Sequence, residues 1–210
     1  MPSDLPIRCA CGALKGVVGG VSAARGNRVV CYCDDCQSFA HFLGNAGQIV
    51  DGHGGTDIFQ TSPALLEITE GADRLACVRL RPKGLLRWYA GCCRTPLANT
   101  PASPRLPFVG LICGGLAPTA EGEKVDEVLG PVRARVNARF ARGDREGLDA
   151  HDRAPLGMMI RLMTKVALSR MRGEHQRTPF FDVTTGEPSA LPRVLGEGEL
   201  RDVEAARDAR

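Results

Sequence analysis

Cysteine is the residue whose type and spacing point most directly to chemistry in this sequence. The 210-residue chain holds nine cysteines, of which seven fall into three groups: Cys9 with Cys11; Cys31, Cys33 and Cys36; and the adjacent Cys92 and Cys93. Thiolate sulfur is a soft ligand that suits zinc. Close spacing lets one turn present two or three sulfurs to one ion at little loop-closure cost. The sequence therefore predicts zinc sites, and the C-x-C-x-x-C run is its most specific signal.

The number of clustered cysteines predicts two sites of different kinds. Structural zinc sites are closed by four protein ligands, whereas catalytic sites use three and keep one position for water or substrate. We expect a closed site from the outer two groups and an open site from the central group: Cys9, Cys11, Cys92 and Cys93 in the first, and Cys31, Cys33 and Cys36 in the second.

The adjacent pair of cysteines leaves an alternative open. Neighbouring side chains of an extended strand point to opposite faces, so Cys92 and Cys93 share one ion only if the chain turns sharply there. Otherwise Cys93 joins Cys9 and Cys11, while Cys92 faces the central group and closes the open site. A redox sensor built on this pair is a further possibility, although a disulfide between neighbours is strained.

The start of the chain, MPSDLPIRCACG, has no basic region followed by an apolar stretch, so we expect no secretory signal. No apolar run approaches the roughly 20 residues that span a bilayer, so an integral membrane protein is not expected. In a reducing cytoplasm, clustered thiols are metal ligands more often than disulfides. We therefore expect a cytoplasmic protein. Cys77 and Cys113 lie outside the clusters, and we expect them to be packing residues.

Short strands must position these cysteines. Runs bounded by Gly, Pro, Asn or Asp predict strands at residues 13–18, 27–32, 56–60, 65–69, 74–80, 85–90 and 108–113. Helical periodicity follows at residues 125–140, interrupted by Gly130-Pro131, and at Leu156–Met171. The expected fold class is α+β: a mainly antiparallel zinc-binding domain over 1–115, a helical extension over 116–180 and a polar tail over 181–210.

The expected helix Leu156–Met171 carries an apolar stripe, made of Leu156, Met159, Ile160, Met163, Val166, Ala167 and Met171. We expect this stripe to pack on the β core while the charges stay in water. The alternative is a helix that binds a membrane surface or a partner. Residues 130–180 hold eleven Lys or Arg against five Asp or Glu. Because this segment has little aromatic interleaving, a nucleic-acid partner is not expected.

The order C-x-C-G, then C-x-C-x-x-C, then a late cysteine followed by Thr-Pro-Leu resembles the glutathione-dependent formaldehyde-activating enzyme and centromere protein V family. The resemblance covers about residues 8–113, including IFQTSPALLEITEG and RWYAGCC. It implies a β-tent of short antiparallel strands around zinc, and an enzyme that joins formaldehyde to glutathione. It also implies that Cys9, Cys11 and Cys93 are structural ligands, and that Cys31, Cys33 and Cys36 hold the catalytic zinc.

The sequence departs from that family at both motifs. The last family motif reads C-x-x-C-G-T, but Ala90 and Arg94 replace its first cysteine and its glycine, and Cys92 is an additional thiol. Near the central group, Tyr32 and Asp34 stand where the family often has His and Ser. Asp34 and Asp35 are either solvated turn residues or partners that orient water and ligands.

Two histidines follow the central group. His41, in the apolar context FAHFLG, is expected to be a hydrogen-bonded core residue, and His53, in DGHGG, an exposed turn residue. Both could instead approach a metal or act as a base.

These residues predict a zinc protein, and the resemblance implies a carbon–sulfur lyase that acts on S-(hydroxymethyl)glutathione or a related thiol adduct. Its partners would be a small thiol such as glutathione and an aldehyde. Cys31, Cys33 and Cys36 would then be ligands at the reacting centre, not covalent nucleophiles. The alternative is a non-catalytic zinc scaffold that binds protein, membrane or nucleic acid through its C-terminal helices.

Overall fold

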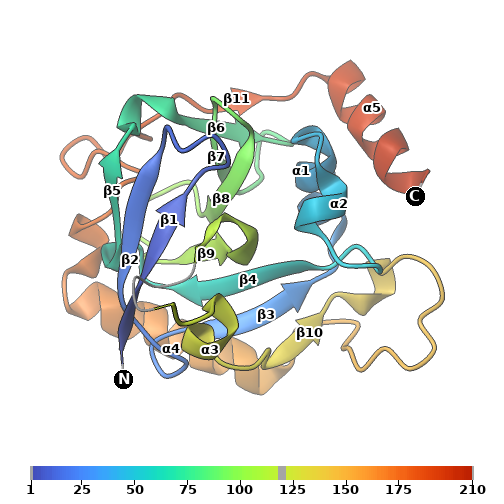
Figure 1. Ribbon diagram of the computed structural model, residues 1–210, viewed down its shortest axis with the longest axis horizontal. Coiled ribbons are helices and arrows are strands. Elements are labelled where there is room, and N and C mark those ends of the chain that lie inside the picture. The colour runs from blue at the N-terminus through green and yellow to red at the C-terminus, as the bar shows by residue number, and fades with distance from the viewer. Residues whose placement is uncertain (1, 118–121, 210) are drawn as a thin grey trace.

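The computed structural model describes residues 2–117 and 122–209, which form two β-sheets flanked by helices (Figure 1). The smaller sheet has the strand order β1-β2-β5, with β1 at Ser3–Arg8, β2 at Lys15–Val21 and β5 at Leu66–Glu70. The larger sheet has the order β10-β3-β4-β9-β8-β7-β6-β11. Its strands are β3 (Asn27–Cys31), β4 (Thr56–Thr61), β6 (Leu75–Arg79), β7 (Leu86–Ala90), β8 (Thr95–Thr100), β9 (Val109–Ile112), β10 (Ala134–Val136) and β11 (Arg193–Val194).

Strand pairing is antiparallel except at the two edges of the larger sheet, where β10 runs parallel to β3 and β11 parallel to β6. The helices are α1 (Asp34–Phe42), α2 (Ala46–Ile49), α3 (Val125–Leu129), α4 (Leu156–Met171) and α5 (Glu197–Asp208). Figure 1 shows the smaller sheet on the left of the molecule, α1 and α5 on the right, and α4 along the lower edge. The fold is α+β and mainly antiparallel, as the sequence predicts.

The main core lies between the two sheets. Leu5 and Val18 of the smaller sheet belong to the same buried cluster as Trp88 and Leu97 of the larger one. Trp88 is fully buried, and its ring centroid lies 5.0 Å from that of Phe180. This packing holds the turn between β1 and β2 close to the turn between β7 and β8, and both turns carry cysteines.

A second cluster attaches α1 to the larger sheet. Phe39 and Phe42 of α1 pack with Val78 of β6 and with Leu195, just after β11. Helix α5 in turn lies against α1, where Arg207 Nη1 donates to Ser38 Oγ at 3.2 Å. The helix that follows Cys33 is therefore fixed on two sides.

All seven strands predicted from the sequence are present, but four others, β1, β8, β10 and β11, were not predicted. Both β1 and β8 contain a proline, Pro6 and Pro96, and proline lacks the N–H that a sheet uses. Pro6 is tolerated because β1 is an edge strand, with β2 as its neighbour in the sheet. Pro96 lies where the register between β7 and β8 shifts. Composition alone cannot reveal such irregular pairings.

The prediction of a helix over residues 125–140 is wrong beyond Leu129. Gly130 has φ 73°, which ends α3, and the chain then pairs with β3 as β10. The polar tail is also more ordered than expected, because it contains the twelve-residue helix α5. Strand β10 comes from the predicted helical extension and β11 from the predicted tail, yet both join the larger sheet of the predicted first domain. The predicted domain boundaries at residues 115 and 180 therefore stay predictions.

Helix α4 has the predicted limits but not the predicted orientation. Of its expected core stripe, Leu156 is 76% exposed, Ile160 58% and Met171 82%, and no residue of α4 is buried. Within the ranges described, no helix is long and apolar enough to cross a membrane.

Candidate metal centres

The first candidate centre consists of four cysteines from the two neighbouring turns. Cys9, Cys11, Cys92 and Cys93 have sulfur atoms that all lie within 4.8 Å of one another. Cys11 Sγ is 3.4 Å from Cys92 Sγ, and Cys9 Sγ is 3.6 Å from Cys11 Sγ and 3.8 Å from Cys92 Sγ. Four sulfurs at about 2.3 Å from a tetrahedral zinc ion lie about 3.8 Å apart. The four thiols therefore have the spacing of a closed zinc site.

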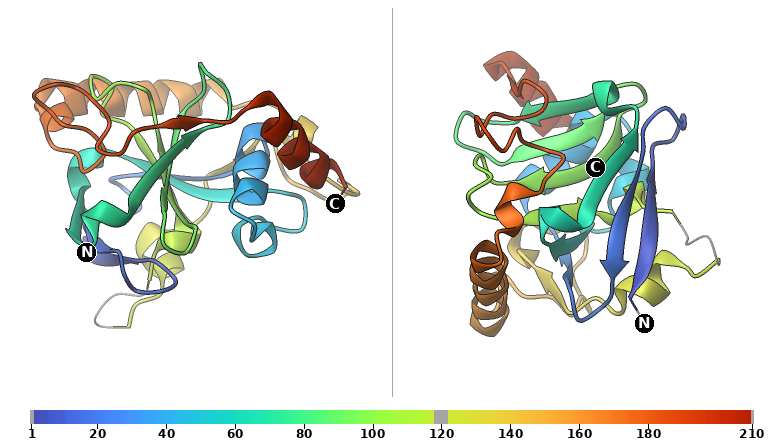
Figure 2. Two further views of the ribbon diagram at one scale, coloured as in Figure 1. Left: turned by 90° about the horizontal axis from the view of Figure 1, so that it is seen from above. Right: turned by 90° about the vertical axis from the view of Figure 1, so that its left-hand side faces the viewer.

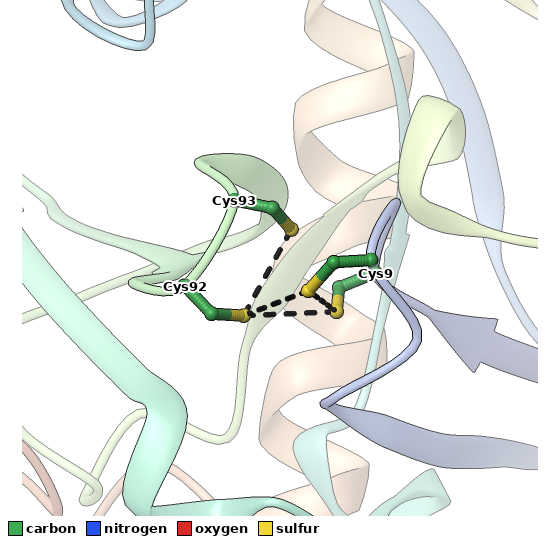
Figure 3. A group of neighbouring side chains, drawn as sticks. Cys9, Cys92 and Cys93 are labelled. Atoms are coloured by element: carbon green, nitrogen blue, oxygen red, sulfur yellow. Dashed lines mark hydrogen bonds between the residues drawn. The ribbon is translucent and has the colours of Figure 1, made fainter.

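Two sharp turns bring these sulfurs together (Figure 3). The turn after β1 closes with the N–H of Gly12 donating to Cys9 O at 2.9 Å, and Gly12 has φ 76°, which favours glycine. In the turn after β7, the N–H of Arg94 donates to Ala90 O at 2.7 Å. Arg94 itself has φ 59°, an uncommon value for a residue with a Cβ. Its guanidinium lies 5.0 Å above the Phe42 ring, a contact that helps to offset this cost.

The turn at Cys92 and Cys93 decides between the alternatives left by the sequence. Their sulfur atoms lie 3.9 Å apart and point to the same cluster, as Figure 3 shows. Cys92 therefore faces Cys9 and Cys11, and the idea that it closes the central group is wrong. The chain no longer runs as an extended strand here, so the alternation of faces does not apply.

Thr95 links the two turns of this first centre. Its hydroxyl accepts the N–H of Ala10 at 2.9 Å and lies 3.1 Å from Cys93 Sγ. Burial opposes ionisation of Cys93, but hydrogen bonds from Thr95 and from the backbone of Cys11 outweigh it and lower the pKa of this thiol to about 6. The N–H of Leu14 also donates to Cys9 Sγ at 3.2 Å. Zinc requires thiolate ligands, and the lowered pKa of Cys93 favours that form.

The second candidate centre holds the central group, Cys31, Cys33 and Cys36, whose sulfurs also lie within 4.8 Å of one another. Cys31 ends β3, Cys33 is the residue before α1, and Cys36 lies in its first turn. The positive end of the α1 dipole therefore faces the three sulfurs and favours thiolates. Among residues 2–117 and 122–209, no fourth His, Cys, Asp or Glu joins this group at that distance.

A buried arginine lies beside the second centre. Arg87 of β7 is only 2% exposed, and its Nη1 lies 3.9 Å from Cys36 Sγ and 3.1 Å from Asn99 Oδ1. Its Nη2 is 3.7 Å from Asp35 Oδ2. A buried guanidinium is costly without negative partners. Hydrogen bonds with Cys31 and Cys33, together with the charge of Arg87, hold the pKa of Cys36 well below its ordinary value. Arg87 would thus offset part of the negative charge that three thiolates carry around a bound metal ion.

The other side of this centre is formed by chain far away in sequence. Asn137 Nδ2 donates to Cys31 Sγ at 3.3 Å. The backbone of Asn137 itself is left-handed, with φ 62°. Met158 of α4 packs on the small cluster that contains Cys31 and Cys36. Cys33 keeps part of its surface exposed, whereas Cys31 and Cys36 are buried. A ligand would therefore approach the group from the side of Cys33.

The remaining residues singled out in the sequence take other places. Asp34 and Asp35 are ion-paired helix residues: Asp35 pairs with Arg81 as well as Arg87, and Asp34 lies 3.7 Å from both Arg142 and Arg207. They are not the solvated turn residues considered above.

Neither predicted histidine belongs to a cysteine group within the described part of the chain. His41 is half-buried on α1. His53 is also half-buried, so the expectation of an exposed residue is wrong, and its Nδ1 lies 3.1 Å from Arg142 O. Cys77 and Cys113 are buried away from both groups, as expected of packing residues.

Arg87, Thr95 and Asn137 escaped the sequence analysis. Arg87 does leave a signal, because a charge within the apolar strand run LLRWYA demands a buried partner. Thr95 lies two residues after Cys93 and begins the Thr-Pro-Leu run noted above. Asn137 leaves no signal in the sequence, because it lies 106 positions after Cys31.

We expect purified protein made under reducing conditions to contain two zinc ions per chain that differ in lability. The four-thiolate centre should hold its ion more tightly than the three-thiolate centre. Titration with a chromogenic chelator should therefore release one equivalent quickly and the second slowly or only on unfolding. Metal-free protein with the same melting temperature as the metal-loaded form would contradict the assignment of both centres.

Comparison with known proteins gives the chain a family but no activity. No curated protein matches it. A crystal structure of a Rhodobacter sphaeroides protein is 16% identical, over 52% of this chain and 85% of that one, with a TM-score of 0.36. Residues 1–191 match the model of a family described as a family of unknown function, DUF6151. The chain, with its two cysteine centres, thus belongs to that family of unknown function.

Proposed function

We propose that this protein holds two zinc ions and uses the second centre to bind a small thiol and form or cleave its hydroxymethyl adduct. The observation that carries the proposal is the group Cys31, Cys33 and Cys36, three convergent sulfurs without a fourth side-chain ligand of the usual kinds in the described chain. Three protein ligands plus one exchangeable position are typical of catalytic zinc. The first centre, with four ligands, is the structural one in this proposal.

The choice of zinc rests on the donors. Soft thiolates at tetrahedral spacing suit zinc, and the buried Arg87 supplies a compensating positive charge next to Cys36. A bound zinc ion would favour the thiolate form of an added thiol and stabilise negative charge on the oxygen of its adduct. Because such thiolates must stay reduced, a reducing compartment such as the cytoplasm belongs to the proposal.

The residues of the chain have defined tasks in this chemistry. Cys31, Cys33 and Cys36 hold the reacting centre and form no bond to carbon. Arg87 and Asn137 fix Cys36 and Cys31 through their sulfur atoms. The partly exposed side of Cys33 is where the thiol enters. Adduct formation joins the thiol sulfur to the aldehyde carbon and moves the thiol proton to the aldehyde oxygen, so no oxidant or reductant is needed.

Glutathione and formaldehyde are proposed as the thiol and the aldehyde because of the motif resemblance over about residues 8–113. Cys9, Cys11, Cys31, Cys33, Cys36 and Cys93 all fall on the cysteines of that motif. The role of Cys92, which the motif lacks at this position, is taken from its sulfur contacts with Cys9 and Cys11. In this protein it supplies the fourth ligand of the first centre.

Thiol binding can be measured independently of turnover. Cobalt-substituted protein should gain sulfur-to-cobalt charge-transfer absorption when glutathione is added, because a further thiolate enters the second centre. Cys33→Ala should lose this response, whereas Cys77→Ala, a cysteine outside both centres, should keep it. Cys92→Ala should disturb the first centre without creating a new thiol response.

Turnover is then tested with glutathione and formaldehyde. Wild-type protein should speed adduct formation above the spontaneous rate, and Cys33→Ala should not. Two bound zinc ions without any spectral response or rate increase would favour the non-catalytic zinc scaffold. A spectral response without turnover would leave a thiol-binding protein whose aldehyde is a different one.

A further inference from the structure

Helix α4 carries six of the eleven large apolar side chains that are exposed in the described part of the chain. Five of them define the outer face of the helix, with exposures from 40% to 82%: Leu156, Met159, Ile160, Met163 and Met171. At 100° per residue they fall within a stripe about 120° wide. Large contiguous apolar patches on protein surfaces mark interaction sites. The outer face therefore has the character of an interaction surface.

The inner side of α4 explains why the helix does not turn this stripe inward. Lys165 points toward the protein, and its Nζ donates to Ala24 O at 2.8 Å and Gly26 O at 3.0 Å. Met158 packs on the cluster around Cys31 and Cys36. These contacts fix the rotation of α4 with its lysine inward and its methionine stripe outward. In both views of Figure 2 the helix lies at the outer edge of the molecule, with its long side open.

The charge of the segment that contains α4 has one sign, although Lys165 itself points inward. From residue 153 to residue 173 the chain holds five basic residues and no acidic one: Arg153, Arg161, Lys165, Arg170 and Arg172. Arg170 Nη1 donates to Arg105 O, which brings the exposed Arg105 and Leu106 next to the end of α4. Asp152 and Glu174 lie just outside the segment, and Glu174 accepts a hydrogen bond from Ser169.

We propose that the outer face of α4 is a docking surface for an anionic lipid bilayer. An apolar helix face in a segment whose only charges are basic is the pattern of a helix that lies in the membrane interface, with its apolar side chains among the acyl chains and its cations at the headgroups. By the same count of 100° per residue Arg170 falls within the stripe, whereas Arg161 and Arg172 lie on the side of α4 nearer to Lys165. The long apolar stems of these arginines let their guanidinium groups extend to the headgroup layer. The inference does not depend on the proposed thiol chemistry.

Charge complementarity selects a bilayer over other occupants. A second copy of the chain would bring two sets of arginines together, which repel. A nucleic acid would use the arginines but leave the leucine and methionine side chains exposed, and α4 has no aromatic residue for base stacking. An anionic bilayer satisfies both the apolar stripe and the basic residues of the same segment.

Vesicle sedimentation with the zinc-loaded, full-length protein tests the proposal. The protein should bind vesicles with about 30% phosphatidylglycerol in phosphatidylcholine at low salt, and bind pure phosphatidylcholine much more weakly. The double substitution Ile160→Asp with Met163→Asp should weaken binding more than tenfold. Arg161→Gln should weaken it roughly fivefold. Leu191→Asp is the control for an added charge, because Leu191 is 93% exposed outside α4 and should leave binding unchanged.

The substituted side chains are exposed, so these variants should keep the wild-type melting temperature and zinc content. Absence of binding to the anionic vesicles would overturn the proposal. So would binding that the double substitution leaves unchanged, or equal binding to both kinds of vesicle. Light scattering that finds a dimer abolished by the double substitution, without vesicle binding, would assign the face to a second copy instead.

Discussion

Replacement of Cys9 or Cys93 by alanine is expected to remove one tightly held zinc ion and to lower the melting temperature by about 8–16 °C. An ion present at about 1,000 times its dissociation constant stabilises the folded state by about 4 kcal/mol. For a chain of this size, each kcal/mol corresponds to about 2–4 °C. Cys9 is 1% exposed and accepts a hydrogen bond from Leu14 N–H, so its loss also disrupts the turn. Metal analysis and calorimetry on the same preparations check both effects.

Two matched variants separate the loss of metal from the loss of a buried thiol. Cys77→Ala removes a buried cysteine outside both centres, and it should keep both ions with a modest loss of stability. Cys36→Ala should remove only the labile ion and lower the melting temperature less than Cys9→Ala does. If Cys9→Ala and Cys77→Ala destabilise the protein equally and retain equal zinc, the four cysteines act as packing residues and not as ligands.

Replacement of Arg87 by methionine is expected to weaken zinc binding at the second centre by about 10–100-fold, the usual effect of removing a group that supports a metal ligand. Methionine fills similar space but leaves Cys36 without its cation, and breaking a buried charged network costs about 3–5 kcal/mol. Arg87 is the only described residue whose guanidinium lies within hydrogen-bonding range of Cys36 Sγ. Competition with a chelator of known affinity measures the first effect, and urea unfolding measures the second.

Asn99 provides the control for this substitution. Its Oδ1 accepts a hydrogen bond from the same Nη1 atom at 3.1 Å, but it carries no charge. Asn99→Ala should therefore destabilise the fold without a large change in zinc affinity. Arg87→Lys should restore part of the affinity, because it keeps the charge and loses the forked geometry. Unchanged zinc affinity in Arg87→Met would show that the second centre does not need this positive charge.

Local patterns were enough to predict seven of the eleven described strands and the limits of α4, because turn residues and apolar periodicity mark them directly. The orientation of α4 was not predictable, because it depends on where Lys165 finds its carbonyl partners. The prediction that the most apolar stripe packs inward assumes that burial of apolar surface alone decides which side of a helix faces the core. Here contacts made by residues 24 and 26 of a distant loop fix the rotation instead.

The cysteine spacing likewise predicted which thiols cluster, but not their surroundings. Cys31, Cys33 and Cys36 are close in sequence, so their convergence is a local property. The placement of Cys92 depended on a turn with Arg94 at φ 59°, a conformation that arginine rarely adopts. Asn137 reaches Cys31 only because β10 adds to the edge of the sheet beside β3. Such long-range pairings have no signature in one sequence.

The two cysteine centres differ in how far apart their ligands lie along the chain, and this difference sets the order in which a growing chain can complete them. The ligands of the second centre span residues 31–36 and leave the ribosome together. Cys9 and Cys92, in contrast, are separated by 83 positions. At roughly 5–20 residues per second, synthesis takes about 4–17 s to cover that interval. If each centre binds a metal ion, the second centre has all its cysteine ligands available early on a nascent chain. The first centre is complete only after β7 and the turn that follows it have been synthesised.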